Sequence, residues 1–360
     1  MNITCNDDLN LYRDIIILYC PEKVGSTSIV SSIRICASNK FIVFHTHNDK
    51  IFDVLNYSNN TMNEINISDI IHNDKTINPI TGKQRKIYII DIFRTPIERK
   101  ISHFFQKISE IHFNNTELNI SNYPMEKITK RFNDIFIHID EIDYYNLYYK
   151  CNIINKFDFN KKYIINNINN IYYIKLRLQD FNEWSNILSE ILNTKIYLIH
   201  DYNTINKNIG NMYKKFKNNY KLPYNYYNQI SKLKSLNIYL DENEKNEYLE
   251  YWSKKLCNYY LPFTKIEYNI YTQISEENKF YCANSSNKHY SDDGCLCTKC
   301  SNKRKKIFNG LKNNILQYIY IRHSFDEFYN NKILLNLQKK INDNNNNNEL
   351  DKIIINLINY

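Results

Sequence analysis

Short apolar runs alternate with segments of helical character along the first half of this chain, and this alternation constrains the fold more than any other feature. The runs at residues 14–19, 41–47 and 86–93 have the length of strands and are rich in Ile, Val, Phe and Tyr. A fourth run, 170–178, precedes an amphipathic segment at 181–192. Strands separated by helices pair in parallel and are covered on their faces. The sequence therefore predicts a three-layer α/β fold with a mostly parallel sheet flanked by helices.

The second half of the chain has a different character. Residues 125–150 and 203–260 have helical patterns, and residues 53–84 are polar and Asn-rich, which favours a loop. A cysteine cluster begins beyond about residue 275, and a last helical region is interrupted by Asn344–Asn348. We expect three parts: an α/β domain over 1–270, a Cys-rich segment over 271–306 and a helical extension over 307–360.

The overall composition excludes several classes of protein. With 43% hydrophobic and 24% charged residues, the chain has the balance of a globular protein. No apolar run reaches the length of a membrane span, and the first residues lack the pattern of a signal peptide, so we expect a cytoplasmic protein. Asn, Ile, Tyr and Lys, whose codons are A/T-rich, are abundant, which suits a giant DNA virus (and then the host cytoplasm) or an A/T-rich protist. The net charge of +9 favours an anionic ligand or partner.

The first candidate site follows the run at 14–19, in the sequence PEKVGSTS at 21–28. A strand, a short loop and a helix hold a phosphate well, because N–H groups at the helix start point at the anion and the helix dipole favours negative charge. Gly25 allows close approach of the backbone, and Lys23 supplies a mobile positive charge. Three hydroxyl donors follow: Ser26, Thr27 and Ser28. The lysine precedes the glycine, so the loop is not a GxxxxGK[ST] box. The same residues could instead form a polar turn that caps the helix.

The second candidate site follows the run at 86–93, in RTPIERKISHF at 94–104. Arg94 comes directly after a buried strand, and ligands of open α/β sheets bind at the carboxyl ends of strands. Ser102 lies two helical turns further on and adds a hydroxyl. Arg94 could instead satisfy carbonyl groups of a helix or loop, and Glu98 and Arg99 could pair with neighbouring side chains.

Taken in order, these two segments resemble the sulfotransferase superfamily. Members of that superfamily use a first-strand loop of the PKxGST kind and a strand ending in RxPxxRxxSxF. A third stretch, 157–184, is similar to the putative capsular polysaccharide synthesis proteins of the superfamily, in which an FD..K.Y segment precedes a strand reading LRLEDL. The resemblance covers roughly residues 12–195.

The resemblance implies a P-loop-like sulfotransferase fold and the donor 3′-phosphoadenosine 5′-phosphosulfate (PAPS). It implies that Lys23 contacts the bridging oxygen of the sulfuryl donor and that Gly25–Ser28 hold the 5′-phosphate. Arg94 and Ser102 would bind the 3′-phosphate. Two residues depart from the family pattern: an extra Glu22 precedes Lys23 and would shift the loop, and Gln179 stands where the family has Glu.

Histidines are the natural candidates for a general base, because their pKa lies near neutral pH. His45 and His47 come at the end of the run at 41–47. We expect the two to differ in direction, so that only one of them faces the site. His103, beside Ser102, is a third candidate. Sulfuryl transfer resembles phosphoryl transfer in relying on positioning and electrostatics, and it requires no metal.

The cysteine cluster contains Cys282, Cys295, Cys297 and Cys300, with His289 between them. Four thiols can close a tetrahedral Zn²⁺ site in a reducing compartment, and His289 could replace one of them. A disulfide pair or free thiols are the alternatives. The basic run Lys303–Lys306 could touch nucleic acid or form a solvated face.

The sequence thus predicts a PAPS-dependent sulfotransferase whose acceptor is a hydroxyl of a carbohydrate or glycan. A nucleotide kinase is disfavoured by the missing phosphate-loop lysine. A nucleic-acid-binding module is disfavoured because the basic and aromatic residues are dispersed. A non-catalytic relative of the same fold, with a zinc-binding C-terminal segment, is a further alternative.

Overall fold

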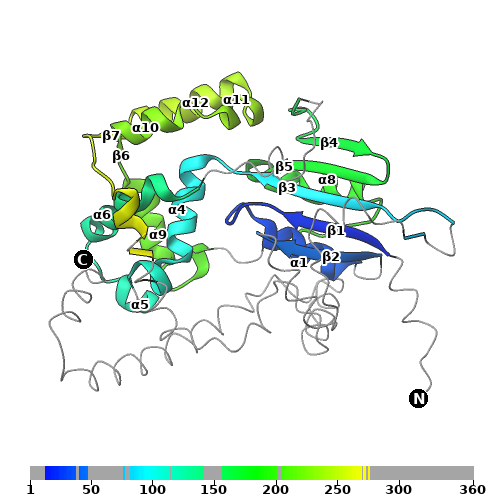
Figure 1. Cartoon of the computed structure of the whole chain (residues 1–360), viewed down its shortest axis with the longest axis horizontal. Helices are drawn as coiled ribbons and strands as arrows, with labels where there is room; N and C mark the ends of the chain where they lie inside the picture. Colours follow the sequence, from blue (N-terminus) through cyan, green and yellow to red (C-terminus); the bar gives the residue numbers. More distant parts are fainter. Residues whose placement is uncertain are drawn as a thin grey trace, which may run out of the picture. The chain divides into compact units, whose positions relative to one another are not determined.

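The computed structural model describes residues 13–37, 40–47, 76–77, 82–113, 115–140, 156–200, 204–269, 271–272 and 275 (Figure 1). The chain divides into two compact units. The described residues up to Arg94 and those from 156 to 200 belong to the first unit, and the others belong to the second.

The first unit is built on a five-stranded sheet with the order β2-β1-β3-β5-β4 (Figure 1). Its strands are β1 (Asp14–Tyr19), β2 (Phe41–Thr46), β3 (Ile87–Phe93), β4 (Tyr163–Ile168) and β5 (Ile171–Arg177). Four of them run in parallel, and only β4 is antiparallel, pairing with β5 at one edge. The prediction of an α/β protein with a mostly parallel sheet is confirmed.

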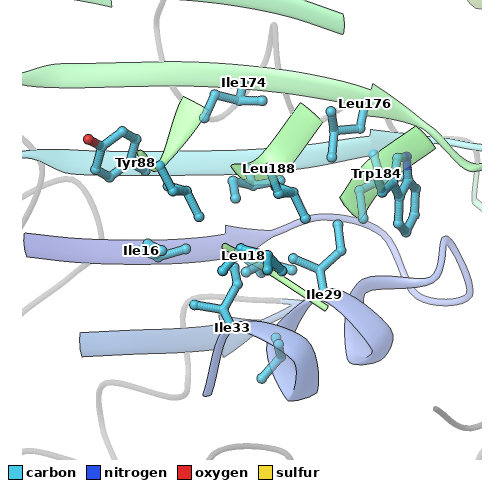
Figure 2. Close-up of a cluster of buried hydrophobic side chains, with 14 of the residues drawn as sticks. Ile16, Leu18, Ile29, Ile33, Tyr88, Ile174, Leu176, Trp184 and Leu188 are labelled. Carbon is cyan, nitrogen blue, oxygen red and sulfur yellow. The ribbon is translucent and has the colours of Figure 1, made fainter. Parts of the chain in front are cut away.

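Two helices of this unit cover one face of the sheet. Helix α1 (Ser26–Ala37) joins β1 to β2, and α8 (Trp184–Ile191) follows β5 through the 3₁₀ segment η4 (Leu178–Glu183). Alternate residues of the strands point toward these helices and form a single apolar core, which Figure 2 shows around Leu18, Ile29 and Trp184. A second helical layer of the predicted three-layer arrangement is not among the described helices of this unit.

The strands also carry charge on their other face. Asp91 in β3 and Lys175 in β5 are register partners in the sheet. The Lys175 ammonium lies 2.5 Å from the Asp91 carboxylate, and the two side chains are 2% and 0% exposed. Asp91 also accepts a hydrogen bond from the backbone N–H of Ile92, at 2.7 Å. The centre of the sheet therefore contains a buried ion pair.

The second unit is mainly helical. Its elements are α4 (Pro96–Gln106), the π-helix η2 (Ile108–His112), α5 (Glu117–Ile120), α6 (Met125–Ile135), η3 (Phe136–His138), η5 (Thr204–Asn206), α9 (Gly210–Asn219), β6 (Leu222–Pro223), α10 (Tyr224–Ile230), α11 (Lys234–Tyr239), α12 (Glu242–Ser253) and β7 (Leu256–Cys257). Aromatic rings dominate its core: Phe132 packs edge-on against Phe104 and Phe216, with ring centroids 5.2 and 5.3 Å away. The prediction that most of residues 203–260 are helical is confirmed.

Several predictions differ from the structure or fall outside its described part. The predicted helix over 125–150 ends as α6 at Ile135. Strand β4 was not predicted. Nearly all of residues 271–360, including Cys282, Cys295, Cys297 and Cys300, lie outside the described residues, so the zinc site and the domain boundaries at 270 and 306 stay predictions. Among the helices that the structure describes, none is long and apolar enough to cross a membrane.

Candidate functional site

The candidate site lies where the order of the sheet reverses. Strand β1 has β2 on one side and β3 on the other, and all three are parallel, so their carboxyl ends meet at one edge. The loop from β1 to α1, Cys20–Gly25, begins at this edge. Open α/β sheets bind their ligands at such a reversal point. The loop with the predicted anion cradle is therefore at the position where this architecture places a ligand.

The backbone of the loop has two residues with positive φ. Lys23 has a φ of 69° and Gly25 a φ of 90°. A Cβ atom on Gly25 would lie 2.8 Å from Cδ1 of Leu178 and 3.2 Å from the ring of Trp184. The loop therefore packs directly against the start of the β5–α8 connection, and only glycine fits at this point.

We expect Gly25→Ala to lower the free energy of unfolding by about 3 kcal/mol, because backbone strain and overpacking add at this position. Gly82→Ala is the matched control: Gly82 also has a positive φ, of 62°, but nothing lies within 4 Å of an added Cβ. We expect this variant to lose only about 1 kcal/mol, from strain alone. Denaturant unfolding measures both. Equal losses in the two variants would show that the loop does not press against Leu178 and Trp184.

Arg94, the first residue of the second candidate segment, contacts the loop of the first. It follows β3 directly, and its Nη1 donates a hydrogen bond to the backbone carbonyl of Lys23 at 2.7 Å. Through Nη1, Arg94 therefore satisfies a loop carbonyl, which is the alternative role that the sequence left open for it. A guanidinium has five N–H donors, and this bond uses one of them. Arg94 therefore holds the backbone of Lys23 and is placed beside the loop that would cradle an anion.

Both histidines at the end of β2 contact the same loop region. His45 Nε2 lies 2.9 Å from the hydroxyl oxygen of Ser26, and His47 Nδ1 lies 2.7 Å from the carbonyl oxygen of Cys20. The prediction that only one of them faces the site is wrong. The reason is that side chains two positions apart along a strand point to the same face of the sheet, so alternation does not separate positions 45 and 47.

The first turn of α1 provides the hydroxyl groups of the cradle. Ser26 and Ser28 are buried and Thr27 is half-buried. The backbone N–H of Ser28 donates to the carbonyl of Gly25, at 3.1 Å. The nearby Cys20 thiol is fully buried; burial raises its pKa far above the ordinary value, and the Asp91 carboxylate raises it further. Cys20 is also part of the apolar core of the first unit.

The residues predicted from the following helix belong to the second unit. Ser102 is buried and His103 half-buried on α4. The Glu98 carboxylate accepts a hydrogen bond from Trp252 Nε1 at 3.3 Å, so Glu98 has a neighbouring partner, as its alternative interpretation predicted. Within the first unit, the structure brings together the loop, Ser26, the two histidines and Arg94.

The third segment of the resemblance forms its own cluster in the first unit. Arg177 makes two hydrogen bonds to the Asp180 carboxylate, at 2.6 and 3.0 Å, and its guanidinium lies 4.6 Å from the ring centre of Phe157. Trp184 Nε1 donates to the carbonyl of Arg177. Gln179, by contrast, is exposed. The FD and LRLQD stretches are therefore linked through Arg177, and this gives them a structural role that does not depend on Gln179.

Asp91 and Lys175 are the site-adjacent residues that sequence reasoning missed. Asp91 is the charged residue of β3, Lys175 stands between apolar residues of β5, which ends in Arg177, and the charges of Asp91 and Lys175 are complementary. An isolated acid and an isolated base in neighbouring apolar runs is the signal that could have identified them.

Comparisons with protein-family models, with curated proteins and with solved structures found no match for this chain. Within the part of the chain that the structure describes, no group of three or more His, Cys, Asp or Glu side chains could hold a metal ion.

Proposed function

We propose that this protein transfers a sulfuryl group from PAPS to a hydroxyl of a carbohydrate or glycan. One observation carries the proposal: the hydrogen bond from Arg94 to the Lys23 carbonyl joins the two segments that resemble sulfotransferase motifs. These segments are far apart in the sequence, and they meet at the reversal point of a parallel sheet. A single doubly phosphorylated adenosine needs such a meeting of two anion-binding segments.

In this proposal the loop and the start of α1 bind the 5′-phosphosulfate. The N–H groups of the first helical turn and the hydroxyls of Ser26, Thr27 and Ser28 favour the anion. Lys23 stabilises the negative charge that develops on the departing phosphate as the sulfuryl group leaves. A histidine takes the proton of the acceptor hydroxyl.

In this proposal Arg94 binds the 3′-phosphate. Arginine suits this task because its planar fork of donors matches the geometry of phosphate oxygens. This assignment gives the site its selectivity for a 3′-phosphorylated nucleotide over AMP or ATP.

Calorimetry with adenosine 3′,5′-bisphosphate (PAP) and with AMP tests the proposal. The wild-type protein is expected to bind PAP more tightly than AMP. Arg94→Ala is expected to weaken PAP binding about 10- to 100-fold, since hydrogen bonds to charged groups contribute about 1.5–3 kcal/mol. It should affect AMP much less, so that the preference for PAP is nearly lost.

Arg94→Lys is the matched control for charge. It keeps the positive charge but not the fork, so an intermediate affinity for PAP is expected. Melting temperatures of both variants report whether the loop stays folded. If the wild-type protein binds ATP as tightly as PAP, the assignment of Arg94 to a 3′-phosphate is wrong.

A further inference from the structure

The two histidines beside the loop use different ring nitrogens. His45 contacts the Ser26 hydroxyl through Nε2, the nitrogen far from its Cβ, whereas His47 contacts the Cys20 carbonyl through Nδ1, the nitrogen near its Cβ. The two rings also pack edge to face, with centroids 4.8 Å apart. They are neighbours with separate contacts, and this separation suggests separate roles.

The contact of His47 fixes its tautomer. A carbonyl oxygen only accepts hydrogen bonds, so the proton of the neutral ring lies on Nδ1 and the lone pair on Nε2. His47 is half-buried, whereas His45 is 5% exposed. His47 therefore donates to the backbone of the loop and not to a hydroxyl of the cradle.

The contact of His45 points to a different role. Its Nε2 lies against a hydroxyl at the first residue of α1, and Ser26 is itself 3% exposed. A buried ring in this position orients the hydroxyl of the cradle. It acts on a bound anion through Ser26.

We propose that His45 is a positioning residue for the Ser26 hydroxyl of the anion cradle. This inference rests on the proposed function.

Replacing His45 and His47 in turn by Asn tests the positioning role of His45. The terminal amide of Asn lies near the position of imidazole Nδ1, and that of Gln near the position of Nε2. His45→Asn therefore cannot reach Ser26, whereas His47→Asn can still donate to the Cys20 carbonyl. We expect His45→Asn to weaken PAP binding about fivefold to tenfold, as loss of one hydrogen bond does. We expect His47→Asn to stay within twofold of wild type and His45→Gln to restore most of the affinity.

A double-mutant cycle separates positioning from a general loss of structure. In a Ser26→Ala background, His45→Asn should cause no further loss of PAP affinity, because its effect passes through that hydroxyl. Melting temperatures are recorded for every variant. Two results would overturn the positioning role of His45. One is an equal loss of PAP affinity in His45→Asn and His47→Asn, and the other is a full additional loss when His45→Asn is made in the Ser26→Ala background.

A second ligand distinguishes failure of this inference from failure of the proposed function. Inorganic pyrophosphate is titrated into the same variants. If the wild-type protein binds pyrophosphate but not PAP, and the variants follow the expected order, the sulfotransferase proposal fails while the positioning role of His45 stands. If it binds neither, both are wrong.

Discussion

Replacing Lys23 by alanine is expected to lower the rate of the proposed sulfuryl transfer about 10²- to 10³-fold, the usual effect of removing one preorganised group that stabilises developing charge. Lys23 belongs to the loop that packs on Trp184 and that Arg94 holds through the Lys23 carbonyl. Because Arg94 binds the backbone and not the side chain, alanine at position 23 keeps this contact. The substitution therefore removes the ammonium with little change to the loop.

Transfer of labelled sulfate from PAPS to a panel of oligosaccharides measures this effect. Binding of PAP, measured in parallel, should weaken far less than the rate falls, since the lysine acts mainly on charge that develops during transfer. Lys40→Ala is the matched control: Lys40 is an exposed lysine of the same unit, bonded to Thr194, and its loss should leave the rate unchanged. Equal rates for wild type and Lys23→Ala would remove Lys23 from the mechanism.

The main architecture could be predicted because the central strands are apolar on both faces. Strands β1 and β3 are buried along nearly their whole length, which requires cover on both sides and favours parallel pairing. Strand β4 was missed because two adjacent Asn residues interrupt the short apolar run in its sequence, YIINNI. Because β4 lies at the edge of the sheet, its sequence can contain polar residues, and these hide the strand pattern.

The location of the site could be predicted for the same reason. The loop and Arg94 both follow apolar strands, and carboxyl ends of parallel strands share one edge. Their contact could not be predicted, because it joins a side chain to a backbone carbonyl whose direction depends on the positive φ of Lys23. The contact of His47 could not be predicted either, because it joins the ring to the backbone carbonyl of Cys20.

The buried pair of Asp91 and Lys175 ties the strand that carries Arg94 to its neighbour. The two residues are register partners three positions before Arg94 and two before Arg177, so the pair lies between the site-bearing ends of β3 and β5. Burial raises the pKa of the Cys20 thiol, and the negative charge of Asp91 raises it further. The pair is thus part of the support beneath the loop.

Lys175→Met is expected to lower the free energy of unfolding by about 3–5 kcal/mol, because it takes the ammonium away from a carboxylate that is buried in the sheet. The double variant Asp91→Leu/Lys175→Met should recover most of this loss, since an apolar pair of similar volume replaces a buried ion pair at little cost. Denaturant unfolding of the single and double variants gives both values.

An exposed ion pair of the same unit provides the matched control. Lys162 and Glu183 lie 3.3 Å apart with side chains 37% and 47% exposed, and Lys162→Met should cost less than about 1 kcal/mol, because water screens the pair. If Lys175→Met were as mild as Lys162→Met, the charge of Asp91 would not depend on Lys175, and the ion pair would not support the sheet. A large loss that the double variant recovers would instead show that charge balance, and not the shape of the lysine, holds β3 against β5 beneath the site.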